Sequence, residues 1–466
     1  ASERVIPNCW LMCKVNSFFL SSLIGSDEIS TLKIFRFIIP MLKVEMLRNQ
    51  RDRVDVGLKK RNWSEEKLVI IDQIIVLDDQ RKEVQTALET ELSEMNNLSK
   101  AIGELMKNKA IDEANSLKVR VGLLKDSSKI KEEMLKSLKE ELEEHLYTIP
   151  NIPHESVPFG IGADDNMVYQ DFTGVMPALP PNALPHWEIG EKYNLFDLKL
   201  GVKVTGSGFV VYRGQGAKLQ RALINYFLDF NTKAGYEEIL PPHLVNEDSA
   251  TATGQLPDKE GQMYYCEKDD LYLIPTSEVP VTNILRDDIL PDHLIPYCMT
   301  SYTPCFRREA GSYGAHVKGL NRVHQFDKVE IVRVEKPERS YEALQEMVAH
   351  VARLMESLEL PYRILRLCGG DMGFASAMTY DFEVWSAGQE RWLEVSSVSN
   401  FETFQSNRLK LRYRDEDNNM QLLHTLNGSS LALARIVAAL LENNQTEEGI
   451  RIPEVLRNFF GAEFIN

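Results

Sequence analysis

Two long segments in the first third of the chain carry apolar residues at alternating three- and four-residue steps, the spacing of a heptad seam. Over residues 64–107 only Arg81 and Glu91 interrupt this seam, whose members are Ile70, Ile74, Leu77, Val84, Leu88, Met95, Leu98, Ile102 and Leu105. Over residues 116–146 the breaks are Ser128 and Lys131, and the members are Leu117, Val121, Leu124, Leu135, Leu138 and Leu142. With a reversal over residues 108–115, the pattern predicts an antiparallel coiled-coil arm about 60 Å long.

The remaining pattern predicts a larger mixed domain. An extended linker is expected where helix cannot persist, at Pro150, Pro153, Pro158, Pro177, Pro180, Pro181 and Pro185. A helix is predicted over about residues 217–232, because one face carries Leu219, Leu223, Phe227 and Phe230. A strand is predicted to begin at residues 239–242. Segments 380–385 and 391–397 are predicted to form a hairpin.

A second predicted hairpin carries the strongest chemical signal. Its first strand contains Phe306-Arg307-Arg308-Glu309, and residues 323–330 return after the glycine-containing loop 310–322, which is expected to move. Alternate strand residues share a face, so Arg307 and Glu309 should point together, as should Phe326, Lys328 and Glu330. A guanidinium suits a phosphate, a carboxylate accepts from an exocyclic amine, and an aromatic ring stacks on a base. A nucleotide wall and a plain surface ion pair both fit this pattern.

Three other polar positions stand out against apolar surroundings. Ten of the eleven residues from Leu431 to Leu441 are apolar, and the exception is Arg435. A guanidinium there needs either an anion or a route to solvent. Thr276-Ser277-Glu278 follows an apolar run, and this position fits either a helix cap or the lining of a ligand pocket. Glu394 and Ser397 fit either ordinary solvent-exposed polar residues or oxygen ligands of a metal ion.

Composition and charge fit a globular protein. The 466 residues are 43% hydrophobic, which allows about three domains. The net charge is −16, yet the predicted arm is uneven: residues 64–96 carry three basic and nine acidic side chains, whereas residues 97–131 carry eight and four. A solvated hairpin and a phosphate-binding tip both remain open. Six cysteines without zinc spacing indicate reduced thiols and a cytosol-like compartment.

Residues 1–40 do not continue the pattern of the rest. Their apolar patches, 18–24 and 34–39, are too short to span a bilayer, and no transmembrane helix is predicted after them. We expect an extension outside the fold, with an organelle-targeting peptide as the alternative.

The segment Phe306-Arg307-x-Glu309 with 324–330 resembles motif 2 of class II aminoacyl-tRNA synthetases, and specifically the bacterial-type seryl-tRNA synthetases. The helix and strand over 217–242 resemble motif 1, and the segment around Arg435 resembles motif 3. The likeness covers about residues 41–460. It implies an α+β fold, in which an antiparallel-sheet catalytic domain (191–466) follows a helical tRNA-binding arm (41–150) and a linker (151–190).

The resemblance also implies roles for individual residues. Arg307 and Arg435 would be catalytic. L-Serine would be held by Thr276, Ser277, Glu278, Glu330, Asn427 and Ser429. ATP would be held by Arg307, Arg308, Glu309, Phe326, Glu394, Val395, Ser396, Ser397 and Arg435, with Mg²⁺ on Glu394 and Ser397. The arm tip would contact tRNA through Lys100, Lys107, Lys109, Lys118, Arg120 and Lys125.

The implied activity is a serine-tRNA ligase that forms seryl-adenylate and charges tRNA(Ser), with tRNA(Sec) as a further candidate. The implied enzyme is a cytoplasmic homodimer without a membrane segment, with organellar import as an alternative if residues 1–40 are native. The competing hypothesis is a catalytically retired, coiled-coil RNA-binding relative. Against it argue the intact residues Arg307, Glu309, Glu394 and Arg435. Departures from the family pattern, which leave local geometry open, are Ser430, Ala434 and Met378.

Overall fold

The computed structural model describes residues 42–258, 261–309 and 318–466. These residues belong to one compact unit, Pro40–Asn466. The predicted extension 1–40 and residues 310–317 of the predicted mobile loop lie outside the described residues.

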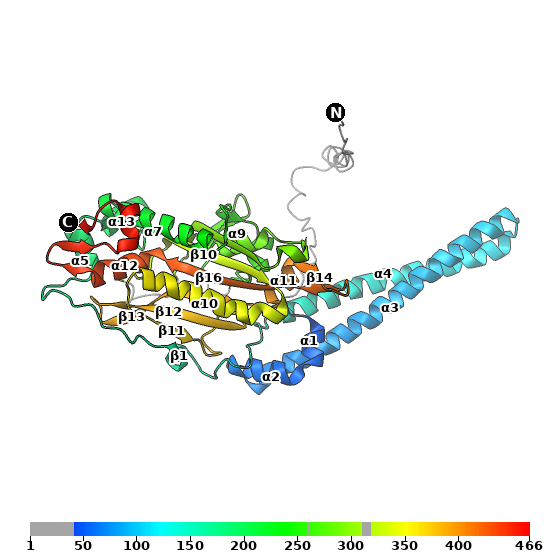
Figure 1. Ribbon diagram of the computed structural model, residues 1–466. Coiled ribbons are helices and arrows are strands. Elements are labelled where there is room, and N and C mark those ends of the chain that lie inside the picture. The colour runs from blue at the N-terminus through cyan, green and yellow to red at the C-terminus, as the bar shows by residue number, and fades with distance from the viewer. Residues whose placement is uncertain (1–41, 259–260, 310–317) are drawn as a thin grey trace, which may run out of the picture. The chain divides into compact units, whose positions relative to one another are not determined.

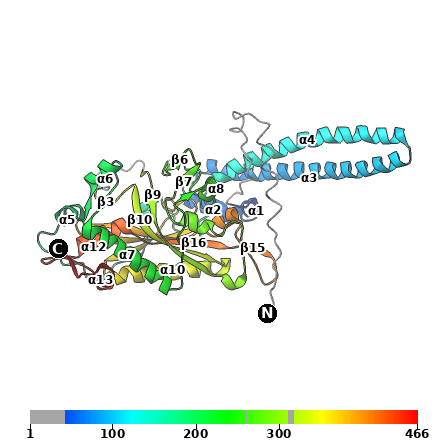
Figure 2. The ribbon, with the colours of Figure 1, turned by 90° about the horizontal axis from the view of Figure 1, so that it is seen from above.

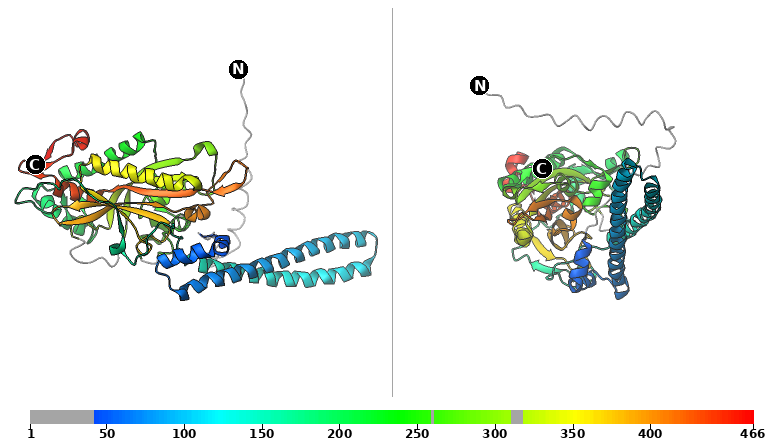
Figure 3. Two further views of the ribbon diagram at one scale, coloured as in Figure 1. Left: turned by 60° about the horizontal axis from the view of Figure 1, so that its bottom comes forward. Right: turned by 90° about the vertical axis from the view of Figure 1, so that its right-hand side faces the viewer.

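Two long helices form the predicted arm. They are α3 (Glu65–Lys107) and α4 (Ile111–Tyr147), preceded by the short helices α1 (Val44–Asn49) and α2 (Arg51–Lys60). Figures 2 and 3 show α3 and α4 side by side as an antiparallel pair. The reversal is shorter than predicted, because only residues 108–110 separate the helices.

The heptad prediction is confirmed in its main register. Its buried members are Ile74, Leu77, Leu88, Leu124, Leu138 and Leu142. At the base, Ile70 is only half-buried, whereas Leu68 and Ile71 are buried, because they form a common core with α1 and α2. Seam breaks in the two helices meet each other: Glu91 accepts from Ser127 Oγ and Lys131 Nζ, both at 2.8 Å.

The larger domain is built on an eight-stranded sheet with the order β1-β11-β12-β13-β16-β10-β9-β4 (Figure 1). These strands are β1 (Met167–Gln170), β4 (Glu237–Glu238), β9 (Tyr297–Phe306), β10 (Gln325–Glu335), β11 (Tyr362–Arg366), β12 (Met378–Ser386), β13 (Arg391–Asn400) and β16 (His424–Ala432). Neighbouring strands are antiparallel, except that β4 runs parallel to β9. The predicted antiparallel sheet is therefore confirmed.

Three helices cover one face of this sheet and share its main core. They are α7 (Gly214–Lys233), α10 (Ser340–Ser357) and α12 (Leu433–Asn443). On β10, Val329 and Ile331 point into that core, so Glu330 between them faces the opposite side. The fold thus leaves a second sheet face for a binding site.

Smaller elements surround the sheet. The helices are α5 (His186–Lys192), α6 (Leu198–Val204), α8 (Glu247–Ala252), α9 (Glu278–Asn283), α11 (Phe404–Leu409) and α13 (Glu454–Phe460). The strands are β2 (Phe196–Asp197), β3 (Val211–Tyr212), β5 (Leu244–Val245), β6 (Tyr265–Cys266), β7 (Leu271–Leu273), β8 (Ile289–Leu290), β14 (Arg412–Arg414), β15 (Met420–Leu422), β17 (Gln445–Thr446), β18 (Gly449–Arg451) and β19 (Phe464–Ile465).

Two local predictions were wrong. No strand begins at residues 239–242, because β4 ends at Glu238 and β5 begins at Leu244. Within the predicted linker, β1 adds an edge strand to the sheet. The C-terminal apolar helix starts at Leu433 instead of Leu431, because β16 continues to Ala432 and Leu431 adopts a positive φ of 74°.

Candidate active site

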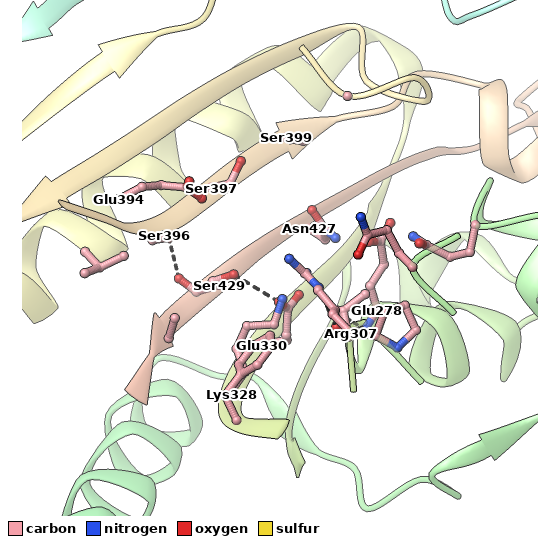
Figure 4. A pocket seen from close by; sticks show the side chains of 18 of the residues that line it. Glu278, Arg307, Lys328, Glu330, Glu394, Ser396, Ser397, Ser399, Asn427 and Ser429 are labelled. Carbon is pink, nitrogen blue, oxygen red and sulfur yellow. Dashed lines mark hydrogen bonds and ion pairs between the residues drawn. The ribbon is translucent and has the colours of Figure 1, made fainter. Parts of the chain in front are cut away.

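A cavity of about 590 Å³ opens on the sheet face opposite the three helices (Figure 4). It gathers residues from segments that lie far apart in the sequence. The predicted site residues that line it are Thr276, Glu278, Arg307, Glu309, Phe326, Glu330, Glu394, Val395, Ser396, Ser397, Asn427, Ser429 and Arg435. The two predicted catalytic arginines therefore face one common space.

At one end of the cavity, Glu330 is held by two donors on a single oxygen. Ser429 Oγ donates to Glu330 Oε1 at 3.0 Å, and Lys328 Nζ forms an ion pair with the same atom. Ser429 lies directly across from Glu330 in the β10–β16 register, and Figure 4 shows the two side chains facing each other. Glu330 Oε2 is buried and has no hydrogen-bond partner in the described part of the chain. A buried carboxylate oxygen that lacks a donor can accept a hydrogen bond from the hydroxyl group of a ligand.

A second buried carboxylate, Glu278 at the start of α9, lies close by. Gln405 Nε2 donates to Glu278 Oε1 at 2.7 Å, and Thr425 Oγ1 donates to Gln405 Oε1 at 2.7 Å. Burial, followed by the negative charge of Glu330, raises the pKa of Glu278 to about 7.

The charges at this end do not cancel when both carboxylates are ionised. Glu278 and Glu330 carry two negative charges, whereas Lys328 contributes one positive charge. A ligand with an ammonium group would complete the balance, and its hydroxyl could reach Glu330 Oε2. This end therefore suits a small hydroxy amino acid.

The opposite wall begins where β9 ends. Arg307 Nε donates to Pro275 O at 3.2 Å, and its guanidinium lies 5.4 Å from the centre of the Phe326 ring. The strand was predicted to continue through Glu309, but it ends at Phe306, and Glu309 has a φ of 50°. Arg307 and Glu309 therefore reach the same cavity through an irregular segment and not through strand alternation.

Two predicted site residues lie outside the cavity lining. Arg308 Nε donates to Met263 O at 2.9 Å, and its guanidinium lies 4.8 Å from the centre of the Tyr264 ring. Ser277 is fully buried, and within the described residues its hydroxyl has no hydrogen-bond partner.

Arg435 closes the far end of the cavity. Its Nε donates to Asn321 O at 2.9 Å, and its Nη1 donates to Glu394 O at 2.6 Å. Every other residue of α12 is buried, whereas the Arg435 side chain is 25% exposed. Backbone carbonyls orient this guanidinium, and Glu394 Oε2 forms a partly exposed ion pair with it at 3.6 Å. An anionic ligand can approach it from the cavity.

A bulge in the β12–β13 hairpin brings Glu394 and Ser397 to one side. Asp381 lies opposite Ser397, and Glu383 lies opposite Glu394. Because residues 381 and 383 share a face, their partners do too, although they are three apart in sequence. Desolvation, followed by the charge of Glu394, raises the pKa of Asp381. Glu394 and Ser397, which both line the cavity, supply oxygen donors of the kind that Mg²⁺ prefers.

Sequence reasoning missed several lining or supporting residues. Lys328 could have been assigned, because alternation had placed it beside Glu330. Asn321 and Gln405 gave no local signal, since their roles depend on packing against distant elements. The departures Met378 and Ser430 are buried, and Ser430 Oγ donates to Asn231 Oδ1 at 3.1 Å. Ala434 is buried beside the cavity.

The predicted tRNA-contacting residues of the arm are exposed around its tip. They are Lys100, Lys107, Lys109, Lys118, Arg120 and Lys125. Arg120 Nε donates to Glu94 at 3.1 Å across the two helices. In the described part of the chain, no helix has both the length and the apolar character needed to cross a membrane.

Comparison with known proteins gives matches over both parts of the chain. Residues 41–153 match the family model "Seryl-tRNA synthetase N-terminal domain", and residues 264–444 match "tRNA synthetase class II core domain (G, H, P, S and T)". The chain is 48% identical to the serine–tRNA ligase of Salinibacter ruber over 90% of this chain and 98% of that relative. It is 45% identical to that of Methylacidiphilum infernorum, over 91% and 100%.

Solved structures agree with these sequence matches. The seryl-tRNA synthetase from Pyrococcus horikoshii complexed with ATP superposes with a TM-score of 0.80 at 31% identity. The cytoplasmic serine–tRNA ligase from Naegleria fowleri in complex with AMP gives a TM-score of 0.79 at 27% identity. Each comparison covers 91% of this chain and 98% of the other.

Proposed function

Because the chain belongs to the seryl-tRNA synthetase family, we propose that it is a serine–tRNA ligase that activates L-serine with ATP and charges tRNA(Ser). The observation that carries the proposal is the unpartnered, buried Glu330 Oε2 in a cavity that also contains Arg307 and Arg435. One space then offers an acceptor for a hydroxyl and two cations for a nucleotide.

Serine is proposed to bind at the carboxylate end. Its ammonium lies against Glu278 and Thr276, its hydroxyl donates to Glu330 Oε2, and Asn427 and Ser429 complete the walls. Alanine lacks the hydroxyl and would leave Glu330 Oε2 unpaired in a buried site. The site is therefore expected to discriminate against alanine because alanine lacks the hydroxyl donor of serine.

ATP is proposed to occupy the remainder of the cavity. Its adenine stacks on Phe326 and donates from its amino group to Glu309, while Arg307 faces the α-phosphate and Arg435 the γ-phosphate. A serine carboxylate oxygen attacks the α-phosphorus, and the bond from that phosphorus to the bridging oxygen breaks, so that pyrophosphate leaves. Catalysis then consists mainly of positioning and charge neutralisation.

Glu394 and Ser397 are the residues that would hold Mg²⁺, and the shared side of the hairpin described above supports this assignment. When bound, the ion would neutralise phosphate oxygens. The protein's own contribution at this end is the Arg435 guanidinium, oriented by the carbonyls of Asn321 and Glu394.

In the second step, a hydroxyl of the terminal adenosine of tRNA attacks the seryl carbonyl carbon, and AMP leaves. The exposed basic residues of the arm tip would contact the RNA backbone. We further propose a cytoplasmic homodimer. Its support is the exposed apolar Leu240 and Leu244, which follow the proposed motif 1 helix α7 and are 81% and 41% exposed. Charging of tRNA(Sec) by the same active site is a further proposal.

Amino-acid-dependent exchange of radiolabelled pyrophosphate into ATP tests the activity directly. Serine should support exchange, whereas alanine, threonine and glycine should not, and Arg307→Ala should abolish it. A matched control is Arg412→Ala, because Arg412 lies outside the cavity lining and its Nε donates to Lys410 O. A folded protein that binds tRNA but shows no serine-dependent exchange would favour the retired, RNA-binding alternative.

A further inference from the structure

A buried histidine–carboxylate pair lies behind the Arg435 end of the cavity. His186 is at the start of α5, and Glu442 is near the end of α12. Their side chains are fully buried, and His186 Nδ1 lies 2.7 Å from Glu442 Oε1. Neither residue lines the cavity.

The second ring nitrogen fixes the protonation pattern of this pair. The backbone N–H of Leu320 lies 2.9 Å from His186 Nε2. A backbone amide can only donate, so Nε2 must present its lone pair, and the ring proton lies on Nδ1, from which it is donated to Glu442. His186 is thus a neutral bridge between α12 and the segment that begins at residue 318.

Glu442 accepts hydrogen bonds from two separate parts of the fold. Oε1 also accepts from the backbone N–H of His186 at 3.0 Å. Oε2 accepts from Ser386 Oγ and from the backbone N–H of Gly388 at 3.1 Å. Ser386 ends β12, and Gly388 belongs to the turn that leads into β13, the strand of Glu394. One carboxylate therefore joins α5, α12 and this hairpin.

The segment held by His186 is the one that orients Arg435. Asn321 directly follows Leu320, and its carbonyl accepts from Arg435 Nε at 2.9 Å. The Asn321 side chain donates to Gln389 Oε1 at 2.8 Å, and Gln389 Nε2 donates to Ser386 Oγ at 2.8 Å. Arg435 and Glu442 are seven residues apart, about two helical turns, so they lie on the same side of α12. The contacts form a closed ring that starts and ends on this helix.

The fit between His186 and the segment is tight. A Cβ placed on Gly319 would come within 2.1 Å of His186 Nε2, and Gly319 has a φ of 71°. Only glycine accommodates both conditions without movement.

We propose that His186 and Glu442 are positioning residues for ATP. They hold the Leu320–Asn321 segment and the hairpin turn so that the Asn321 carbonyl aims the Arg435 guanidinium at the terminal phosphate. This inference rests on the role of Arg435 in the proposed function. A buried pair that serves only stability is the competing explanation.

Two amide substitutions test the role of each ring nitrogen of His186 separately. In His186→Gln the amide oxygen can take the place of Nε2 and still accept from Leu320. In His186→Asn the amide nitrogen can take the place of Nδ1 and still donate to Glu442, but the Leu320 N–H loses its acceptor. We expect His186→Asn to raise KM for ATP by about tenfold, the effect of one lost buried hydrogen bond, and His186→Gln by less than about threefold. KM for serine should stay unchanged in both.

The matched control is His424→Asn. His424 is also buried, and its Nδ1 lies 2.7 Å from Ser340 Oγ, but it does not line the cavity. This variant should lose thermal stability without a change in KM for ATP. If both His186 variants lost stability and kept the wild-type KM for ATP, the positioning role would be overturned.

Arg435→Ala, measured in parallel, separates this inference from the proposed function. A raised KM for ATP in Arg435→Ala with a normal value in His186→Asn would sink only the inference. An unchanged value in Arg435→Ala would overturn the role of Arg435 and the inference with it. If the His186 variants fail to fold, Gln389→Ala provides the test, because Gln389 is half-exposed and tethers Asn321. It should raise KM for ATP by about threefold, and an unchanged value would overturn the proposal.

Discussion

Gln405 donates from its amide nitrogen to Glu278 Oε1 at 2.7 Å. The orientation of this amide is itself fixed, because Thr425 Oγ1 donates to the Gln405 oxygen at 2.7 Å and leaves the nitrogen to face Glu278. α11 and β16 thus cooperate to hold a buried carboxylate at the proposed ammonium site.

The charge state of Glu278 predicts a pH dependence of serine binding. Burial, followed by the charge of Glu330, raises the pKa of Glu278 to about 7, so this carboxyl gains a proton as the pH falls through that value. A neutral carboxyl cannot balance an ammonium. KM for serine should be constant above about pH 8 and should rise toward tenfold per pH unit below about pH 7.

Exchange kinetics between pH 6 and 8.5 at saturating ATP measure this dependence. The Gln405 hydrogen bond lowers the pKa of Glu278, so Gln405→Met should move the rise in serine KM to higher pH. A serine KM that stays flat down to pH 6 in the wild-type protein would contradict the assignment.

The Lys328–Glu330 pair predicts a large stability effect. The two side chains are 7% and 2% exposed, so Lys328→Met would leave a buried carboxylate without its cation. We expect a loss of about 3–5 kcal/mol in the free energy of unfolding, measured with urea. The double variant Lys328→Met/Glu330→Gln should recover most of this loss, because the remaining group is neutral.

The control for this effect is the exposed pair Lys59–Glu65. Lys59→Met should leave the urea midpoint essentially unchanged, since a solvated ion pair contributes little. A Lys328→Met variant as stable as the wild-type protein would show that the buried pair does not neutralise Glu330.

Glu330 predicts how serine is distinguished from alanine. In Glu330→Gln the Oε1 position can still accept from Ser429 and Lys328, but an amide NH₂ replaces the unpartnered Oε2. The ratio of kcat/KM for serine over alanine should fall about 100-fold, the value of one charge-assisted hydrogen bond. Asp327→Asn, on the same strand but outside the cavity lining, should leave the ratio unchanged. An unaltered ratio in Glu330→Gln would remove Glu330 from the recognition of serine.

Substitutions at the arm tip should affect the charging of tRNA without affecting the activation of serine. Replacement of Lys107, Lys109 and Lys118 by alanine should weaken aminoacylation through a higher KM for tRNA, and it should leave serine-dependent exchange unchanged. The dependence of tRNA affinity on salt should fall by about one unit of log–log slope per lysine that contacts a phosphate. Lys67→Ala near the arm base is the control, and an equal effect there would argue against tip-specific binding.

Local patterns in the sequence were sufficient for the elements that depend on local spacing. The heptad seam predicted the arm, and strand alternation placed Lys328 and Glu330 on one face. The predicted convergence of Arg307 and Arg435 on one cavity is confirmed. The roles proposed for these residues stay predictions.

Features that depend on long-range packing could not be predicted in this way. The bulge that brings Glu394 and Ser397 together is visible only in the pairing of β12 with β13. In the sequence Glu91 is only an interruption of the seam, because its hydrogen-bond partners lie on α4. His186 and Glu442 are more than 250 residues apart, and no local pattern links them.

A co-crystal structure with α,β-methylene-ATP, Mg²⁺ and L-serine tests the central claim most directly. One nucleotide should place its α-phosphate at Arg307 and its terminal phosphate at Arg435, with the serine hydroxyl on Glu330 Oε2. A nucleotide that contacts only one of the two arginines, or serine bound away from Glu330, would contradict the account.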